Sequence, residues 1–178
     1  MGPTLPGTMD TVSYYGICSI MLTPTEFMVI GGESSGILGG TLVQAYSAET
    51  GEWDSWDDLS VSRWGHSCTR LGDQVIVAGG VSPLFTILAS TTVLDLNTRE
   101  QREVGQMMGP RAWFGMATID GKAFAFGGMS PLKDQYSNIL ELDMEIEEWV
   151  EREDTMATAQ GISSFASVVV QQSQICGP

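Results

Sequence analysis

The sequence predicts an all-β fold, a partial β-propeller of about three four-stranded antiparallel blades with one extra strand. Three observations support this prediction. Glycine accounts for 21 of the 178 residues, which indicates many turns between short strands. Three apolar segments, at 27–32, 74–80 and 122–128, each end in a Gly-Gly pair and recur at one spacing. Four strands in a repeat of about 40 to 50 residues are typical of a propeller blade.

The repeat has a period of 48 residues, which several positions share. The glycine pairs begin at Gly31, Gly79 and Gly127. Chance alone would place about two to three Gly-Gly pairs in a chain of this composition. Four are present, so the shared spacing, and not the number of pairs, indicates the repeat. Further positions in the same phase are Tyr46, Leu94 and Leu142, then Trp53, Gln101 and Trp149, and upstream Arg63 and Arg111.

The middle unit shows the order of elements most clearly. We expect a first strand over 63–71, a turn at 72–73, and a second strand that runs through VIVA into the glycine pair. A loop leads to a third strand through Leu94, and the turn-like DLNTRE joins it to a fourth strand over 101–104. The second strands are apolar on both faces, as expected where neighbouring blades cover both. The predicted divisions are an incoming segment 1–13, a repeat array 14–172 with blades over about 15–59, 63–107 and 111–155 and a partial strand 159–172, and a tail 173–178.

These units resemble the kelch repeat, in which an apolar strand ends in Gly-Gly and a Tyr and a Trp follow at set distances. The first unit has all four residues, at Gly31, Gly32, Tyr46 and Trp53. The third unit has a leucine in place of the tyrosine, and the second unit lacks both aromatic residues. We expect the glycines to lie where a strand end meets neighbouring backbone without room for a Cβ. We expect Tyr46, Trp53 and Trp149 to be buried.

Charge and cysteine usage limit the classes of partner and compartment. Acidic residues outnumber basic residues by 22 to 8, for a net charge of −14, which disfavours nucleic acid and anionic membranes as partners. No run of about 18 apolar residues predicts a membrane span, and no signal peptide is recognisable at the start. Cys18, Cys68 and Cys176 have no metal-type spacing, so we expect neither a zinc site nor a disulfide framework. We therefore expect a cytoplasmic protein, with an extracellular one as the alternative if the chain is a fragment.

The sequence gives little support for catalysis. His66 is the only histidine, and we expect it to serve in packing or hydrogen bonding. No catalytic, cofactor-binding or metal-binding residues are predicted. The acidic clusters at 52–58 and 145–154 are expected on hairpins and outer strands, where charge discourages sheet extension.

Partner binding is expected at the loops that follow the glycine pairs, at 33–41, 81–91 and 129–138, because a rigid scaffold presents binding residues on loops. The middle loop is uncharged and is either a contact patch or packed against a neighbouring blade. The two in-phase arginines either bind an acidic peptide or hydrogen-bond between blades. The candidate partner-binding residues are Arg63, Leu84, Phe85, Arg111 and Leu132.

The predicted function is a non-enzymatic protein–protein interaction module that presents loops to a protein or peptide partner. The kelch resemblance further implies a substrate-recruiting adaptor. The alternative is a fragment of a kelch-type enzyme, or of a secreted carbohydrate-active protein, with its active site in other blades. Because the ring is incomplete, we also expect self-association through the open blade faces.

Overall fold

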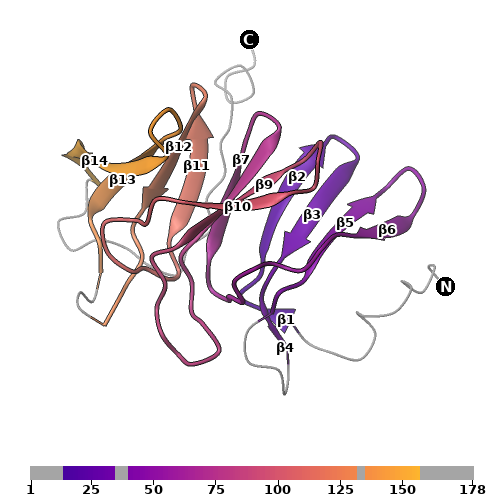
Figure 1. Ribbon diagram of the computed structural model, residues 1–178, viewed down its shortest axis with the longest axis horizontal. Coiled ribbons are helices and arrows are strands. Elements are labelled where there is room, and N and C mark those ends of the chain that lie inside the picture. The colour runs from indigo at the N-terminus through magenta and orange to yellow at the C-terminus, as the bar shows by residue number, and fades with distance from the viewer. Residues whose placement is uncertain (1–13, 35–39, 132–134, 157–178) are drawn as a thin grey trace, which may run out of the picture.

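The fold is that of a computed structural model, which describes residues 14–34, 40–131 and 135–156 (Figure 1). Every helix or strand within these residues is a β-strand, and the strands form three consecutive four-stranded antiparallel sheets, here called blades 1, 2 and 3. The predicted all-β class and the partial propeller of three blades are therefore confirmed. In this described part of the chain, no helix is long and apolar enough to cross a membrane.

Within each blade the strands are hydrogen-bonded in the order in which they occur along the chain. Blade 1 contains β2 (Cys18–Thr23), β3 (Glu26–Ile30), β5 (Val43–Ser47) and β6 (Glu52–Ser55). Blade 2 contains β7 (Ser67–Leu71), β8 (Gln74–Ala78), β9 (Thr91–Asp95) and β10 (Gln101–Val104). Blade 3 contains β11 (Gly115–Ile119), β12 (Lys122–Phe126), β13 (Asn138–Asp143) and β14 (Glu148–Thr155). A short pair, β1 (Tyr14–Tyr15) with β4 (Glu33–Ser34), adjoins blade 1.

The first strand of blade 2 begins at Ser67 and not at Arg63 as predicted. Gly65 has a φ of +60°, a left-handed conformation that interrupts an extended strand. Arg63 and Trp64 instead form isolated bridges with Gly40 and Val81. The partial strand expected at 159–172, the incoming segment 1–13 and the tail 173–178 lie outside the described residues.

The hydrophobic core lies between the blades. In β8, Val75 and Val77 pack in the cluster toward blade 1, whereas Ile76 and Ala78 pack in the cluster toward blade 3. All four side chains are fully buried. This explains why the second strand is apolar at every position: each of its faces is covered by a neighbouring blade.

The glycine pairs form the seams between blades, as expected. Gly31 and Gly79 have φ values of +60° and +63°, and a Cβ at Gly79 would lie 2.4 Å from the Arg111 carbonyl oxygen. In the first two pairs the second glycine donates its N–H to the next blade: Gly32 to the Arg63 carbonyl at 3.0 Å, and Gly80 to the Arg111 carbonyl at 2.9 Å. The role of these glycines is therefore structural.

Cys18 of β2 and Cys68 of β7 form a disulfide, with their Cα atoms 6.0 Å apart. The expectation that the cysteines form no disulfide was therefore wrong. The two residues are 50 positions apart in the sequence, and only the packing of one inner strand beside the next brings them together. The bond links blade 1 covalently to blade 2.

The expected burial of the aromatic repeat positions is confirmed for one residue only. Trp149 is 5 % exposed, and it packs in the cluster between blades 2 and 3. Tyr46 and Trp53 are only partly buried, because they lie on the face of blade 1 that points away from blade 2.

Candidate functional site

The two ends of the blades carry different kinds of connection. In an antiparallel meander the first and third turns lie at one end, and the second turn and the crossing to the next blade lie at the other. We call these the hairpin end and the loop end. In Figure 1 the long connections of the loop end are at the bottom and the hairpin tips are toward the top. All the loops expected to contact a partner therefore belong to one end.

The 81–91 loop presents its most apolar residues to solvent. Leu84 is 86 % exposed and Phe85 is 66 % exposed. A tight turn holds them outward, in which the Phe85 N–H donates to the Ser82 carbonyl at 2.9 Å. Phe85 has a φ of +57°, a strained conformation for an aromatic residue. Leu84 and Phe85 therefore do not pack against a neighbouring blade, whereas Ile87 and Leu88 of the same loop are partly buried.

Three aromatic residues form a row beside this loop, which we call the aromatic ladder. The ring centroids of Tyr15 and Trp64 are 5.7 Å apart, and those of Trp64 and Trp113 are 5.4 Å apart, both pairs edge to face. Trp64 is joined to the loop by two backbone hydrogen bonds with Val81, of 3.1 and 2.8 Å. The ladder and the exposed loop residues are thus parts of one surface.

Trp113 occupies a backbone position that is glycine in the other two blades. The Trp113 N–H donates to the Gly65 carbonyl and the Gly65 N–H donates to the Gly16 carbonyl, both at 2.8 Å. These three residues have φ values of +52°, +60° and +66°. A left-handed conformation costs a side-chain-bearing residue about 1–2 kcal/mol. Trp113 lies against Gly65, where an added Cβ would be 3.0 Å from its indole nitrogen.

Sequence reasoning missed the aromatic ladder. Trp64 and Trp113 are 49 residues apart, one position out of the repeat phase, so the spacing did not connect them. Each blade has an aromatic residue just before its first strand, at Tyr15, Trp64 and Trp113. This shared position is the signal that could have indicated the ladder.

Arg63 does not face a partner, because its side chain is fully buried. Its guanidinium donates to the Gly79 carbonyl at 2.9 Å, to the Ser90 carbonyl at 3.1 Å and to Thr92 Oγ1 at 3.1 Å. All three acceptors belong to blade 2, whose first strand begins four residues after Arg63. Burial lowers the pKa of Arg63 to about 10, with the charge of Glu103 acting in the opposite direction, so the side chain stays charged at neutral pH.

Arg111 repeats this arrangement in blade 3 and is also fully buried. It donates to the Gly127 carbonyl and to Asn138 Oδ1, both at 3.2 Å. Its guanidinium carbon lies 4.1 Å from the ring centroid of Tyr136. The burial of both arginines leaves no exposed guanidinium for a peptide. The alternative of hydrogen bonding between blades holds for their backbone, because the Arg63 and Arg111 carbonyls accept from Gly32 and Gly80 of the preceding blade. Each guanidinium instead joins the second and third strands of its own blade.

The last candidate partner-binding residue, Leu132, lies outside the described residues, together with 133–134 and the 35–39 part of the first loop.

His66 is 6 % exposed and fills the space left by two glycines, since a Cβ at Gly31 would lie 2.6 Å from its ring. Burial, and then the charge of Arg63, lower the pKa of His66 to about 3, against the opposite influence of the Ile30 backbone. His66 is therefore a neutral packing residue.

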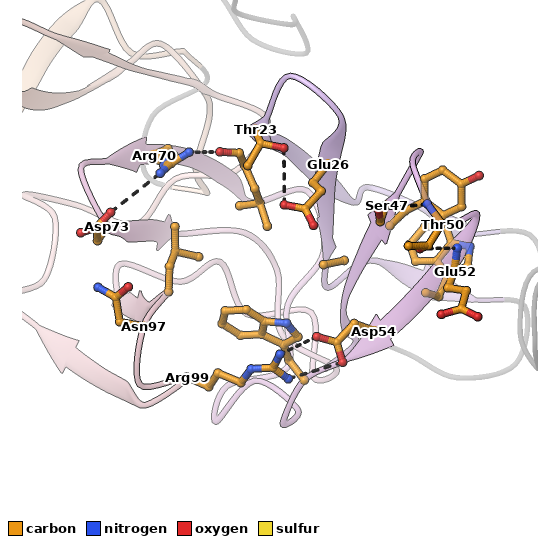
Figure 2. Close-up of a pocket in the computed structure, with 16 residues that line it drawn as sticks. Thr23, Glu26, Ser47, Thr50, Glu52, Asp54, Arg70, Asp73, Asn97 and Arg99 are labelled. Atoms are coloured by element: carbon orange, nitrogen blue, oxygen red, sulfur yellow. Dashed lines mark hydrogen bonds and ion pairs between the residues drawn. The ribbon is translucent and has the colours of Figure 1, made fainter.

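The hairpin end has a pocket of about 600 Å³ between blades 1 and 2 (Figure 2). Arg99 of blade 2 crosses it to Asp54 of blade 1, at 2.5 Å, and lies 4.9 Å from the ring centroid of Trp56. Arg70 donates to the Leu22 carbonyl of blade 1. The charged groups of the pocket thus hold the two blades to each other. Among the described residues, no three His, Cys, Asp or Glu side chains are arranged to hold a metal ion.

The loop end is therefore the candidate functional surface. Residues 79–91 carry no charged side chain, and the only one in 105–115 is the buried Arg111. Exposed apolar and aromatic side chains beside these two segments without exposed charge favour contact with another apolar group. The acidic clusters lie on the outer strands and the hairpins, except for Asp57 and Asp58, which are exposed in the crossing from blade 1 to blade 2.

Comparison with known proteins gives a partial similarity to a kelch-repeat protein. No protein-family model matches the chain. An F-box/kelch-repeat protein of Arabidopsis thaliana is 28 % identical over 105 residues, which are 59 % of this chain and 22 % of that protein. The match thus spans about a fifth of that relative. Over that segment the chain is similar to a kelch-repeat protein, in agreement with its 48-residue repeat.

Proposed function

We propose that the chain is part of a kelch-type propeller that binds a protein partner at its loop end. The observation that carries this proposal is the continuous surface formed by the aromatic ladder and the exposed Leu84 and Phe85. Strained backbone is a feature of binding sites, and both the exposed Phe85 and the partly buried Trp113 have positive φ values. The partial similarity to a kelch-repeat protein supports the fold assignment on which this rests.

The chemistry of the surface favours an apolar, uncharged segment of the partner. An acidic peptide would find no exposed arginine among the described residues of the loop end, because Arg63 and Arg111 are buried. Aromatic side chains dominate the energy of many protein interfaces. The ladder supplies such side chains on a rigid backbone, so little conformational entropy is lost on binding.

An adaptor role is the finer form of this proposal. The relative from Arabidopsis thaliana combines kelch repeats with an F-box in its name. A chain of this type would contribute the recruiting surface, and another domain would contribute the effector. We favour a non-enzymatic module over an enzyme fragment because the only histidine is buried and uncharged.

For the compartment, the disulfide favours the extracellular alternative over the cytoplasmic expectation. Disulfides persist in oxidising compartments and are rare where glutathione keeps thiols reduced. The Cys18–Cys68 bond is therefore easier to reconcile with a secreted or cell-surface protein.

The test is selection of peptides from a phage-displayed random library on the immobilised chain. We expect apolar peptides to be enriched, and we expect the Leu84→Ala, Phe85→Ala double variant to bind them at least about tenfold more weakly. A matched control neutralises Glu147, Glu148 and Glu151 with glutamine, and it should bind as the wild type does. Loss of binding in the glutamine variant but not in the alanine variant would place the site at the hairpin end and refute the proposal.

A further inference from the structure

Among the described residues, one face of blade 1 is covered by no other blade, and it is unusually aromatic. Met21, Phe27, Tyr46 and Trp53 are cross-strand neighbours in one row over its four strands. The ring centroids of the last three lie 5.2 to 5.6 Å apart. Met21 is 55 % exposed, and an apolar groove of about 400 Å³ opens beside it. We call this surface the leading face.

The repeat shows what covers the equivalent face of the other blades. The leading-face residues Phe27, Tyr46 and Trp53 have equivalents 48 and 96 residues later in the chain. The first set of equivalents points from blade 2 toward blade 1. The second set points from blade 3 toward blade 2. All but Gln101 are at most 5 % exposed. These equivalent positions are Val75, Leu94 and Gln101, then Ala123, Leu142 and Trp149. In blades 2 and 3, the face equivalent to the leading face is therefore covered by the preceding blade.

The Trp53 position also donates a hydrogen bond to the preceding blade wherever one is present. Gln101 Nε2 donates to the Asp58 carbonyl at 2.9 Å. Trp149 Nε1 donates to Thr91 Oγ1 at 2.9 Å. Trp53 Nε1 is shielded from water but has no hydrogen-bond partner among the described residues. A buried N–H without an acceptor is costly, and an acceptor from a covering blade would satisfy it, as Thr91 satisfies Trp149.

The outer face of blade 3, here called the trailing face, is the other half of the same kind of interface. Its positions correspond to residues of blades 1 and 2 that point toward the following blade. Phe124 and Ile139 are partly exposed and Val150 is 45 % exposed. The equivalent residues are Met28, Val43 and Asp54 in blade 1, and Ile76, Thr91 and Arg102 in blade 2; the first two of each set are at most 1 % exposed.

We propose that a second copy of the chain covers the leading face with its trailing face. The same two kinds of face already meet twice within the chain, between blades 1 and 2 and between blades 2 and 3. If the contact forms twice in a two-fold dimer, two sets of the three described blades close a ring of six. Propellers close with about four to eight blades. A head-to-tail contact gives a closed ring only when the rotation between neighbouring copies brings the last copy back to the first.

Charge sets the conditions for this dimer. Each copy carries a net charge of −14, so like-charge repulsion opposes association at low ionic strength. The leading-face row is itself uncharged. We therefore expect salt to strengthen the dimer by screening the repulsion.

The experiment is sedimentation equilibrium of the 178-residue chain at low and high salt. We expect a dimer of twice 19.2 kDa, which salt strengthens. Met21→Glu on the leading face and Val150→Glu on the trailing face should each raise the dissociation constant at least about tenfold. Both side chains are exposed in the single chain, so neither change should disturb its fold. The matched control is Phe85→Glu at the loop end, which should dimerise normally.

A mixture of the two variants tests the head-to-tail geometry. The Met21→Glu copy keeps an intact trailing face, and the Val150→Glu copy keeps an intact leading face. Mixed together they should form a dimer through one intact contact, although each alone does not. A monomer under all conditions, a dimer indifferent to Val150→Glu, or growth beyond two copies would each overturn the proposal. The test does not involve partner binding at the loop end, so the two proposals can fail separately.

Discussion

The indole nitrogen of Trp149 donates a hydrogen bond to Thr91 Oγ1 at 2.9 Å, across the boundary between blades 3 and 2. Thr91 is fully buried and Trp149 is 5 % exposed. The bond thus lies inside the inter-blade core, where a lost partner would leave a buried polar group unsatisfied. It makes Trp149 the aromatic residue of the repeat with the largest expected effect on stability.

We expect Trp149→Ala to lower the free energy of unfolding by about 3–5 kcal/mol, because it opens a cavity and removes this bond. Trp53→Ala should cost clearly less, since Trp53 is only partly buried and its Nε1 has no hydrogen-bond partner among the described residues. Urea denaturation followed by circular dichroism measures both, under conditions that keep the chain monomeric. Losses under about 1 kcal/mol for both variants would contradict the packing of the repeat.

Arg63→Met should destabilise the chain by about 3–5 kcal/mol, since it leaves the Gly79 and Ser90 carbonyls without their donor. Arg111→Met should cost less, because fewer hydrogen bonds hold its guanidinium. The control is Arg99→Met, which removes an ion pair whose two side chains are half exposed and should cost about 1 kcal/mol or less. Equal effects at Arg63 and Arg99 would show that the buried guanidinium is not a structural link.

A feature of this fold could be predicted from the sequence where it repeats in every blade. The strands and the glycine seams were predictable because each blade needs the same backbone at the same place, so Gly31, Gly79 and Gly127 recur at one spacing. Trp113 was not predictable as a ladder residue, since it stands where the other blades have glycine. The Cys18–Cys68 disulfide depends on how two inner strands pack side by side, and a distance of 50 residues in sequence carries no signal for it.

The disulfide should be measurable in two ways. Thiol titration of the denatured chain should find one free thiol, from Cys176, before reduction and three afterwards. Cys18→Ser should lower stability by about 2–4 kcal/mol. Cys176→Ser, which removes a cysteine outside the bond, is the control and should leave stability unchanged. Three free thiols in the protein isolated without reductant would show that the bond does not form.

His66 should make the stability of the chain depend on pH. Its pKa is about 3 in the folded chain and 6.5 in the unfolded chain. As pH falls through 6.5, the unfolded state therefore takes up a proton that the folded state does not accept. Stability is fully present above the unfolded pKa and is lost below it, by about 2 kcal/mol between pH 7 and pH 5.

The variant that isolates this effect is His66→Phe, because blade 3 has Phe114 at the equivalent position. Phe114 packs beneath a glycine in the same way, since a Cβ at Gly79 would lie 2.8 Å from its ring. Urea denaturation at pH 7, 6 and 5 should show a shallower loss of stability for His66→Phe than for the wild type. The acidic residues titrate in both proteins, so only the difference between the two slopes reports on His66. Parallel slopes would mean that His66 accepts a proton in the folded chain, and that water or a polar group reaches its ring.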